Sequence, residues 1–103
     1  MDDVRIYTGT LVADLVLPGA RSLKDLRGPL HSLVRKLRNQ DFAVARVGPA
    51  DLRQRAFVAV AAVSGEVDLV EGRLDEAERQ LYDSPFEVAD LRRGVAVETF
   101  TSA

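Results

Sequence analysis

The order in which strand-like and helix-like patterns alternate constrains this chain more than any other feature of its sequence. Residues 4–17 and 42–47 have strand patterns on either side of one helical stripe, and residues 56–63 and 86–100 flank a second one. The predicted order is therefore β-α-β-β-α-β. Within 103 residues, two interleaved units of this kind predict the ferredoxin-like split β-α-β fold, an α+β fold. We expect a single domain over residues 1–103, with a four-stranded antiparallel sheet in the order 4-1-3-2 and two helices on one face.

The first helix is marked by apolar residues three or four positions apart. Ser22, followed three residues later by Asp25, is similar to a capping box and predicts the start of the helix. Gly28 and Pro29 lie inside the stripe. Because an interior proline removes one backbone hydrogen bond, we expect either a kink or a regular helix that begins near Pro29.

The second half of the chain repeats this pattern. Ser64 can cap a second helix, and Ser84-Pro85 ends it. Its apolar stripe consists of Val67, Val70, Leu74, Ala77 and Leu81. The last strand contains Arg92-Arg93-Gly94, where we expect a bulge or a bend.

The third strand predicts that the sheet face opposite the helices is covered. Residues 56–63 are uniformly apolar, whereas a sheet with one wet face alternates apolar and polar residues. We therefore expect a homodimer or higher homo-oligomer through the open sheet face. The residues expected on that face are Ile6, Val12, Val16, Val58 and Val60. The alternative is that the alanines of residues 56–63 are small enough to stay exposed.

Charged residues are unevenly distributed, although the formal net charge is only -2. Residues 21–55 contain nine Lys or Arg and three acidic residues, net +6, whereas residues 64–93 contain four and nine, net -5. Right-handed crossovers predict that a basic flank of the first helix overhangs the second strand and an acidic flank of the second helix overhangs the fourth. The alternative is a salt-bridge ladder between the helices. The basic flank consists of Lys24, Arg27, His31, Arg35 and Arg38, and the acidic flank of Asp68, Glu71, Asp75 and Glu78.

Three stretches carry distinctive residues: Leu17-Pro-Gly-Ala-Arg-Ser-Leu-Lys-Asp25, Val47-Gly48, and Asp51-Leu-Arg-Gln-Arg-Ala56. Together they resemble the YlxP-like family of small uncharacterised bacterial proteins. The resemblance covers most of the chain and implies a ferredoxin-like fold. The genes of that family often lie among translation and ribosome-maturation genes, which points to RNA. The resemblance implies no established activity.

In this fold, the loop after the first strand and the loop between the second and third strands lie at the same end of the sheet. Free N–H groups and the helix dipole at the start of the first helix favour an anion there. We therefore expect an anion- or RNA-binding site formed by Arg21, Ser22, Lys24, Arg27, Arg53, Gln54 and Arg55, which His31, Arg35 and Arg38 extend along the basic flank. The alternative is that Ser22 only caps the helix, that Asp25 completes the cap or pairs with Arg55, and that the other charges are solvated.

Composition excludes several kinds of site. Without cysteine the chain has no disulfide, thiolate nucleophile or cysteine–metal site, and one histidine excludes a multi-histidine metal site within one chain. We find no nucleophile triad, phosphate loop or metal signature, and we expect no enzyme activity, no cofactor and no metal. No apolar run approaches the roughly 18 residues of a membrane span and no signal peptide opens the chain, so we expect a cytoplasmic protein without membrane contact.

These patterns favour a non-catalytic RNA- or ribosome-associated module that binds phosphates through its basic end. A self-associating structural or protein-interaction module is the alternative, and a binder of a small phosphorylated metabolite is a third possibility. Residues 55–60, together with Tyr7, are faintly similar to the RNA-binding strands of RRM domains. That stacking mode needs several exposed aromatic residues, and this segment has one.

Overall fold

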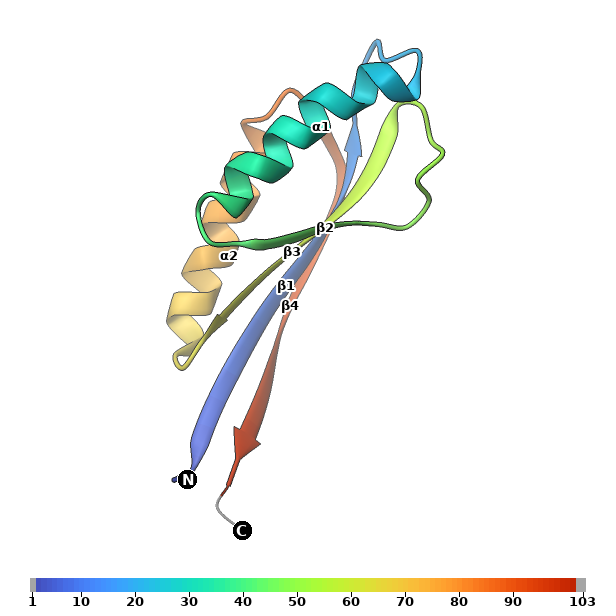
Figure 1. Cartoon of the computed structure of the whole chain (residues 1–103). Coiled ribbons are helices and arrows are strands. Elements are labelled where there is room, and N and C mark those ends of the chain that lie inside the picture. The colour runs from blue at the N-terminus through green and yellow to red at the C-terminus, as the bar shows by residue number, and fades with distance from the viewer. Residues whose placement is uncertain (1, 102–103) are drawn as a thin grey trace.

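The computed structural model describes residues 2–101 and has the predicted element order. The strands are β1 (Val4–Val16), β2 (Ala43–Val47), β3 (Arg55–Ser64) and β4 (Glu87–Phe100), and the helices are α1 (Leu23–Arg38) and α2 (Val67–Tyr82). All strand pairs are antiparallel, the sheet order is β2-β3-β1-β4, and both helices cover one face of the sheet (Figure 1). The predicted ferredoxin-like α+β fold and its strand order are confirmed.

The hydrophobic core lies between the two helices and one face of the sheet. Leu11 of β1 pairs with Val60 of β3, and Ala13 pairs with Val58, so these four side chains point to the same side and are buried. The helices cover them with stripes of buried residues: Leu26, Leu30, Leu33 and Leu37 from α1, and Val70, Leu74, Ala77 and Leu81 from α2. The predicted stripe of α2 is confirmed except at Val67, which is exposed, and in α1 the apolar residues Leu23 and Val34 are only half-buried.

The prediction that Val58 and Val60 line the open sheet face is wrong. Their side chains are 0% and 1% exposed and belong to the core under the helices. The open side of β3 instead carries Phe57, Ala59 and Ala61, which pair with the open-face residues Asp14, Val12 and Thr10 of β1. Because successive side chains of a strand point to opposite faces, a uniformly apolar strand gives no signal for which face is buried.

A side-chain cap defines the start of α1. The Ser22 hydroxyl accepts a hydrogen bond from the Asp25 N–H at 3.2 Å, and the Asp25 carboxylate accepts one from the Arg21 N–H at 3.0 Å. This is the predicted capping arrangement, with the carboxylate reaching one residue further back than in a standard capping box. The helix runs without interruption through Pro29 to Arg38, so the predicted later start at Pro29 is wrong.

The second half departs from prediction in two local features. Glu66, not Ser64, is the N-cap of α2, and the Ser64 hydroxyl instead accepts a hydrogen bond from the Glu66 N–H at 3.1 Å. The irregularity in β4 lies at Ala89, opposite the step from Asp14 to Leu15, and not at residues 92–94. Residues 92–94 stay in register with β1, and Arg93 contacts three carboxylates of α2.

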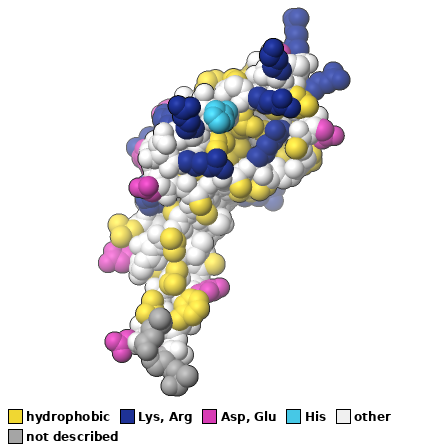
Figure 2. All heavy atoms as spheres, in the orientation of Figure 1, with side chains coloured by type: hydrophobic (Ala, Val, Ile, Leu, Met, Phe, Trp, Pro, Cys, Tyr) yellow, Lys and Arg dark blue, Asp and Glu magenta, His cyan; other side chains and the backbone are white. Residues whose placement is uncertain are grey.

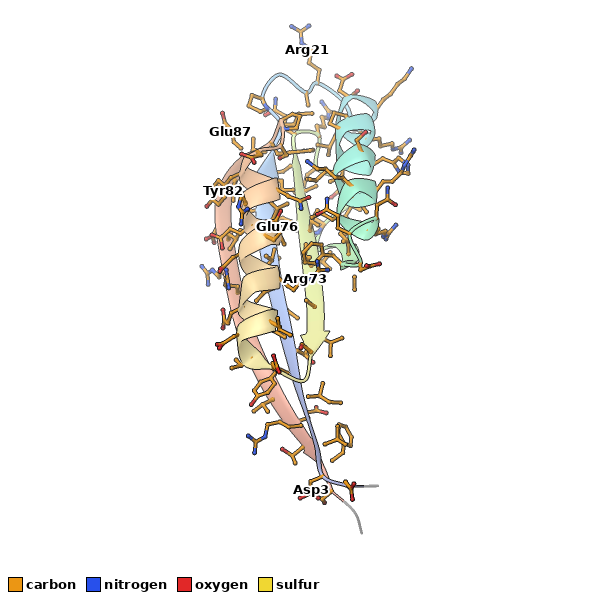
Figure 3. The ribbon with its side chains drawn as sticks, turned by 90° about the vertical axis from the view of Figure 1, so that its left-hand side faces the viewer. Asp3, Arg21, Arg73, Glu76, Tyr82 and Glu87 are labelled. Carbon is orange, nitrogen blue, oxygen red and sulfur yellow. The ribbon has the colours of Figure 1, made fainter. Side chains whose placement is uncertain are left out.

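β1 and β4 continue beyond the rest of the sheet as a two-stranded ribbon (Figure 1). β1 pairs with β3 only from Tyr7 onward, whereas its pairing with β4 begins at Val4 opposite Phe100. The ribbon makes the molecule elongated, with extents of 55 × 23 × 23 Å. The predicted basic residues at the start of α1 lie at the opposite end from this ribbon (Figure 3).

Candidate anion-binding site

Two loops meet beside the start of α1, as predicted. The Leu17 N–H donates a hydrogen bond to the Gln54 carbonyl oxygen at 2.7 Å, which joins the loop after β1 to the loop before β3. A shallow hollow at this junction is lined by Ala20, Arg21 and residues 51–55. Three of the predicted ligands, Arg21, Arg53 and Gln54, are exposed here, and Arg21 projects outward from this end of the molecule (Figure 3).

Not every predicted residue offers a free group at this hollow. The Ser22 hydroxyl is used by the helix cap. Lys24 and Arg27 are exposed on α1 and do not line the hollow. The start of α1 is therefore flanked by two groups of cations, one in the hollow between the loops and one on the outer side of the helix.

Arg55 is engaged by a carboxylate on the open face of the sheet. Its Nε and Nη2 donate to the two carboxylate oxygens of Asp14 at 3.0 and 2.5 Å, and its guanidinium lies 5.4 Å from the centroid of the Phe57 ring. The hydrogen bond from Arg55 lowers the pKa of Asp14, burial opposes this effect, and the positive charge of Arg55 lowers the pKa further. Of the two roles that the alternative gave Asp25, it has the first: it completes the helix cap, and Arg55 pairs with Asp14 instead.

The basic flank of α1 overhangs β2, in agreement with the predicted handedness. Arg38 Nη2 donates to the Val44 carbonyl oxygen of β2 at 2.9 Å, which fixes the end of the helix over that strand. All five members of the basic flank are exposed. Figure 2 shows Lys and Arg side chains gathered around the single histidine on this side of the molecule.

The acidic flank of α2 overhangs β4, also as predicted. Arg93 of β4 reaches the carboxylates of Glu71, Asp75 and Glu78 at 2.7, 2.8 and 3.0 Å. Burial lowers the pKa of Arg93, but the hydrogen bonds to these carboxylates outweigh it and raise the pKa above its ordinary value. These acidic residues therefore form no salt-bridge ladder with the basic flank of α1. The two flanks lie over opposite edges of the sheet.

Arg46 of β2 is a cation that the predicted site does not include. It pairs with Val58 in the sheet, which places its side chain on the helix-facing side, as for Val44 two residues earlier. Its Nε and Nη2 atoms are buried and have no hydrogen-bond partner within the described part of the chain. The signal in the sequence was the alternation of residues 42–47, which places Arg46 on the same face as Phe42 and Val44.

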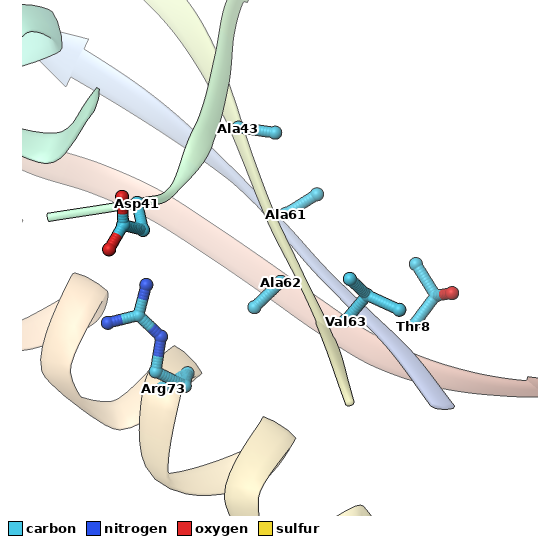
Figure 4. Close-up of a pocket in the computed structure, with 7 residues that line it drawn as sticks. All are labelled: Thr8, Asp41, Ala43, Ala61, Ala62, Val63 and Arg73. Carbon is cyan, nitrogen blue, oxygen red and sulfur yellow. The ribbon is translucent and has the colours of Figure 1, made fainter. Parts of the chain in front are cut away.

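A second hollow, of about 430 Å³, lies beside the end of β3 (Figure 4). It exists because β2 begins at Ala43, opposite Ala61, and leaves the last residues of β3 without a neighbour on that edge. Arg73 and Asp41 stand at one end of it. The Arg73 guanidinium lies 3.9 Å from the centroid of the Phe42 ring and donates to the Gln40 carbonyl oxygen at 2.6 Å, so it serves to pack α2 against the α1–β2 connection.

Three further observations concern stacking surfaces, metal sites and membrane spans. Tyr7 is partly buried and packs against the core, so it does not join Phe57 on the open face in an RRM-type stacking surface. Within residues 2–101, no group of three or more His, Asp or Glu side chains is placed to hold a metal ion. Over the same range, no helix has the length and apolar character needed to cross a membrane.

Comparison with known proteins identifies one family. A family model described as a protein of unknown function, DUF503, matches residues 8–93. A solved structure titled "Structural Genomics, protein YJCS" is similar with a TM-score of 0.44 and 12% sequence identity, over 84% of this chain and 96% of that one. None of the curated proteins matches the sequence. The expectation of a family without an assigned function is confirmed, whereas the narrower YlxP-like assignment stays a prediction.

Proposed function

Because the chain belongs to the DUF503 family, whose function is unknown, we propose a function from the geometry of its own surface. The protein is a non-catalytic module that binds the backbone phosphates of RNA, with ribosomal RNA as the first candidate. The binding surface consists of the exposed cations in the hollow beside the start of α1 and of the basic flank.

The observation that carries this proposal is the separation of charge across the molecule. Three carboxylates of the acidic flank, Glu71, Asp75 and Glu78, form ion pairs with Arg93 of the same chain. Within residues 2–101, by contrast, no cation of the basic flank forms a salt bridge, and neither does Arg21 or Arg53. A cluster of exposed cations without carboxylate partners attracts a polyanion, and the counterions condensed on the polyanion are released when it binds.

Salt-dependent RNA binding tests the proposal. The double variant Lys24→Gln/Arg27→Gln removes two cations of the basic flank, and Arg5→Gln/Arg79→Gln removes two exposed cations elsewhere as a charge-matched control. Fluorescence anisotropy with a short single-stranded RNA at several salt concentrations gives the slope of log K against log [salt]. We expect the first variant to flatten that slope by about 1.4 units, at roughly 0.7 per lost contact, and the control to leave it unchanged. Co-sedimentation with ribosomal subunits at low and moderate salt then tests the ribosomal partner.

Two results contradict the proposal. If the wild-type protein binds no RNA, or binds it with an affinity that does not depend on salt, the basic surface is not an RNA-binding surface. Equal slopes for the wild type and the Lys24→Gln/Arg27→Gln variant place the RNA contacts elsewhere on the molecule.

A second candidate function is self-association through the open sheet face. The observation that favours it is Val12, a valine in the middle of β1 that is 37% exposed on this face. It lies beside Ala59 of β3, and Ala45 of β2 continues the same row. A second copy of the chain would bury these apolar side chains, and such a dimer would respond to salt far less than an RNA complex does.

A further inference from the structure

We infer that β4 pairs along its outer edge with β4 of a second copy of this chain. The paired segment is residues 94–100, which runs antiparallel to its own copy about a twofold axis at Val97 and joins the two sheets into one. The interface lies at the edge of the sheet, so it differs from the open sheet face of the second candidate function. It goes beyond the proposed RNA binding and does not depend on it.

The ends of β1 and β4 form a ribbon that lacks a third strand. Among the described residues, residues 4–6 of β1 pair only with β4 (Figure 1). The ribbon carries exposed apolar side chains on both faces: Val97, which is 55% exposed, on the helix side, and Val4 and Phe100 on the open side. Two-stranded ribbons are only marginally stable in water by themselves, and a further strand stabilises them.

Residues 94–100 are the unblocked part of the outer edges of the sheet. β2, the opposite edge strand, has only five residues, and the Arg38 side chain occupies its Val44 carbonyl oxygen. Residues 87–93 of β4 contain an irregularity and four charged residues. Residues 94–100, by contrast, contain one charged residue and no proline, and they stay in regular register with β1. Because proteins normally block long edge strands with charges, prolines or bulges, this segment is suited to pair with another strand.

The side chains of this segment complement their own copies in the antiparallel register. With the axis at Val97, the two Val97 side chains meet on the helix side. Phe100 lies opposite Gly94 of the second copy and covers the open space beside that glycine. Glu98 lies opposite Ala96, so the register places no two like charges directly opposite each other.

The same register fixes where Arg5 of the second copy lies. α2 crosses the sheet with Val70 against Gly9, which pairs with Val95 of β4. In the dimer, Thr99 of the second copy lies opposite Val95, and Arg5 of that copy pairs with Thr99. Arg5 of the second copy is therefore at the level of Val70, two strand spacings or roughly 10 Å from Val95.

This position faces the acidic flank at the start of α2. Arg5 is on the helix side of the ribbon because it is two residues from Tyr7, which packs against the core. Asp68 and Glu71 lie within one turn of Val70, on the side of α2 that overhangs β4. Arg5 and Asp68 are exposed and form no ion pair among residues 2–101. Each copy thus offers the other a free cation and a free carboxylate, which favours a second copy over an unrelated strand.

Sedimentation equilibrium of the intact protein tests the interface. The paired segments are short, so we expect a dimer with a micromolar dissociation constant, populated at concentrations on the order of 100 µM. Val97→Lys places two ammonium groups opposite each other at the axis and is expected to raise that constant by about tenfold or more. Val63→Lys, at an exposed position on the open face of β3, is the charge-matched control and keeps the dimer. Circular dichroism checks that both variants are folded.

A charge exchange and an introduced cysteine test the register. Arg5→Glu is expected to weaken the dimer, and Arg5→Glu/Asp68→Arg to restore it, because the two charges have been exchanged across the axis. The chain contains no cysteine, so Val97→Cys introduces a single thiol that lies opposite its own copy. With oxidised glutathione this variant is expected to form a disulfide-linked dimer faster than Val63→Cys does.

Three outcomes overturn this inference. A wild type that stays monomeric at this concentration has no such interface. A dissociation constant that is unchanged in Val97→Lys places the contact elsewhere, and its increase in Val12→Asp would assign the contact to the open sheet face. Equal cross-linking of the two cysteine variants, without rescue by the charge exchange, excludes the register. None of these outcomes bears on RNA binding, because the proposed RNA surface lies at the opposite end of the molecule from the ribbon (Figure 3).

Discussion

Asp14 of β1 and Arg55 of β3 are joined by two hydrogen bonds across the open face of the sheet, Nε to Oδ1 at 3.0 Å and Nη2 to Oδ2 at 2.5 Å. The pair neutralises one cation of the loop region that is otherwise strongly basic. Arg55 is therefore less available to an external anion than Arg21 and Arg53. Those two residues are exposed at the same end of the molecule and have no ion-pair partner in the described chain.

Replacing Asp14 by Asn is expected to strengthen RNA binding by releasing Arg55. One additional phosphate contact steepens the slope of log K against log [salt] by about 0.7 units for single-stranded RNA. Anisotropy titrations of the wild type and Asp14→Asn at several salt concentrations measure this change. Asp90→Asn, which releases Arg92 on β4, is the matched control and should leave the slope unchanged.

The same pair makes a pH-dependent contribution to stability. The folded pKa of Asp14 is lowered from its ordinary value of 3.8, so the contribution is complete above that value and is lost as the pH falls through the folded pKa. The difference in free energy of unfolding between the wild type and Asp14→Asn should therefore shrink as the pH is lowered below about 3.8. Urea unfolding at pH values on both sides of this point measures it, and a constant difference would contradict the assignment.

Arg93 and Arg92 are neighbours in sequence with opposite structural roles. Arg93→Gln leaves Glu71, Asp75 and Glu78 without their shared cation and is expected to cost about 1–2 kcal/mol, a value reduced by solvent screening. Arg92→Gln, on the other face of β4, should cost about 0.5 kcal/mol or less. Urea unfolding at low salt compares the two variants, and equal costs would show that the three-carboxylate cluster contributes nothing.

The cap of α1 contributes to stability rather than to binding. Ser22→Ala removes the acceptor of the Asp25 N–H and is expected to lower the free energy of unfolding by about 1 kcal/mol. Ser32→Ala, at an exposed position in the same helix, should be neutral or slightly stabilising because alanine is the better helix former. A larger loss of RNA affinity than of stability in Ser22→Ala would assign the hydroxyl to the ligand instead.

Close packing of α2 against β1 depends on Gly9. A Cβ atom at this position would lie closer to side-chain carbons of Val70 and Leu74 than van der Waals contact allows. Gly9→Ala is therefore expected to cost about 1–3 kcal/mol through overpacking. Gly94→Ala places its Cβ in open space and should be tolerated, so thermal unfolding of this pair of variants isolates the steric effect.

Self-association through the open sheet face should depend on Val12. Val12→Asp introduces a charge into the middle of the open face. If the second candidate function holds, light scattering at concentrations on the order of tens of micromolar should show a dimer for the wild type and a monomer for this variant. Val67→Asp adds the same charge at an exposed position at the start of α2 and should leave the assembly unchanged. A wild-type protein that is already monomeric at these concentrations contradicts the open-face interface.

Several features were predictable because they depend on local chemistry or on the handedness of the chain. The leucines of α1 recur at helical spacing, and Ser22 with Asp25 marks the start of that helix. The placement of Arg38 over β2 and of Glu71 over β4 follows from right-handed crossovers once the order of elements is known. Each of these predictions uses only the spacing of residues and the chirality of the backbone.

Other features were decided by packing in three dimensions. Residues 56–63 are apolar on both sides, so only the register with β1 determined that Val58 and Val60 are buried and that Phe57 is on the open face. Arg55 and Asp14 are far apart in sequence, and the sheet brings them together.

The sequence by itself therefore determined the order of elements, the faces of both helices and the two charged edges, since these follow from periodicity and chain handedness. Only the tertiary structure decided which cations are neutralised and which remain available. Arg55 and Arg93 meet carboxylates from other strands and helices, whereas Arg21 and Arg53 form no ion pair among residues 2–101. The physical reason is that pairing and burial depend on neighbours distant in sequence, whose positions are set by sheet register and helix packing rather than by local spacing.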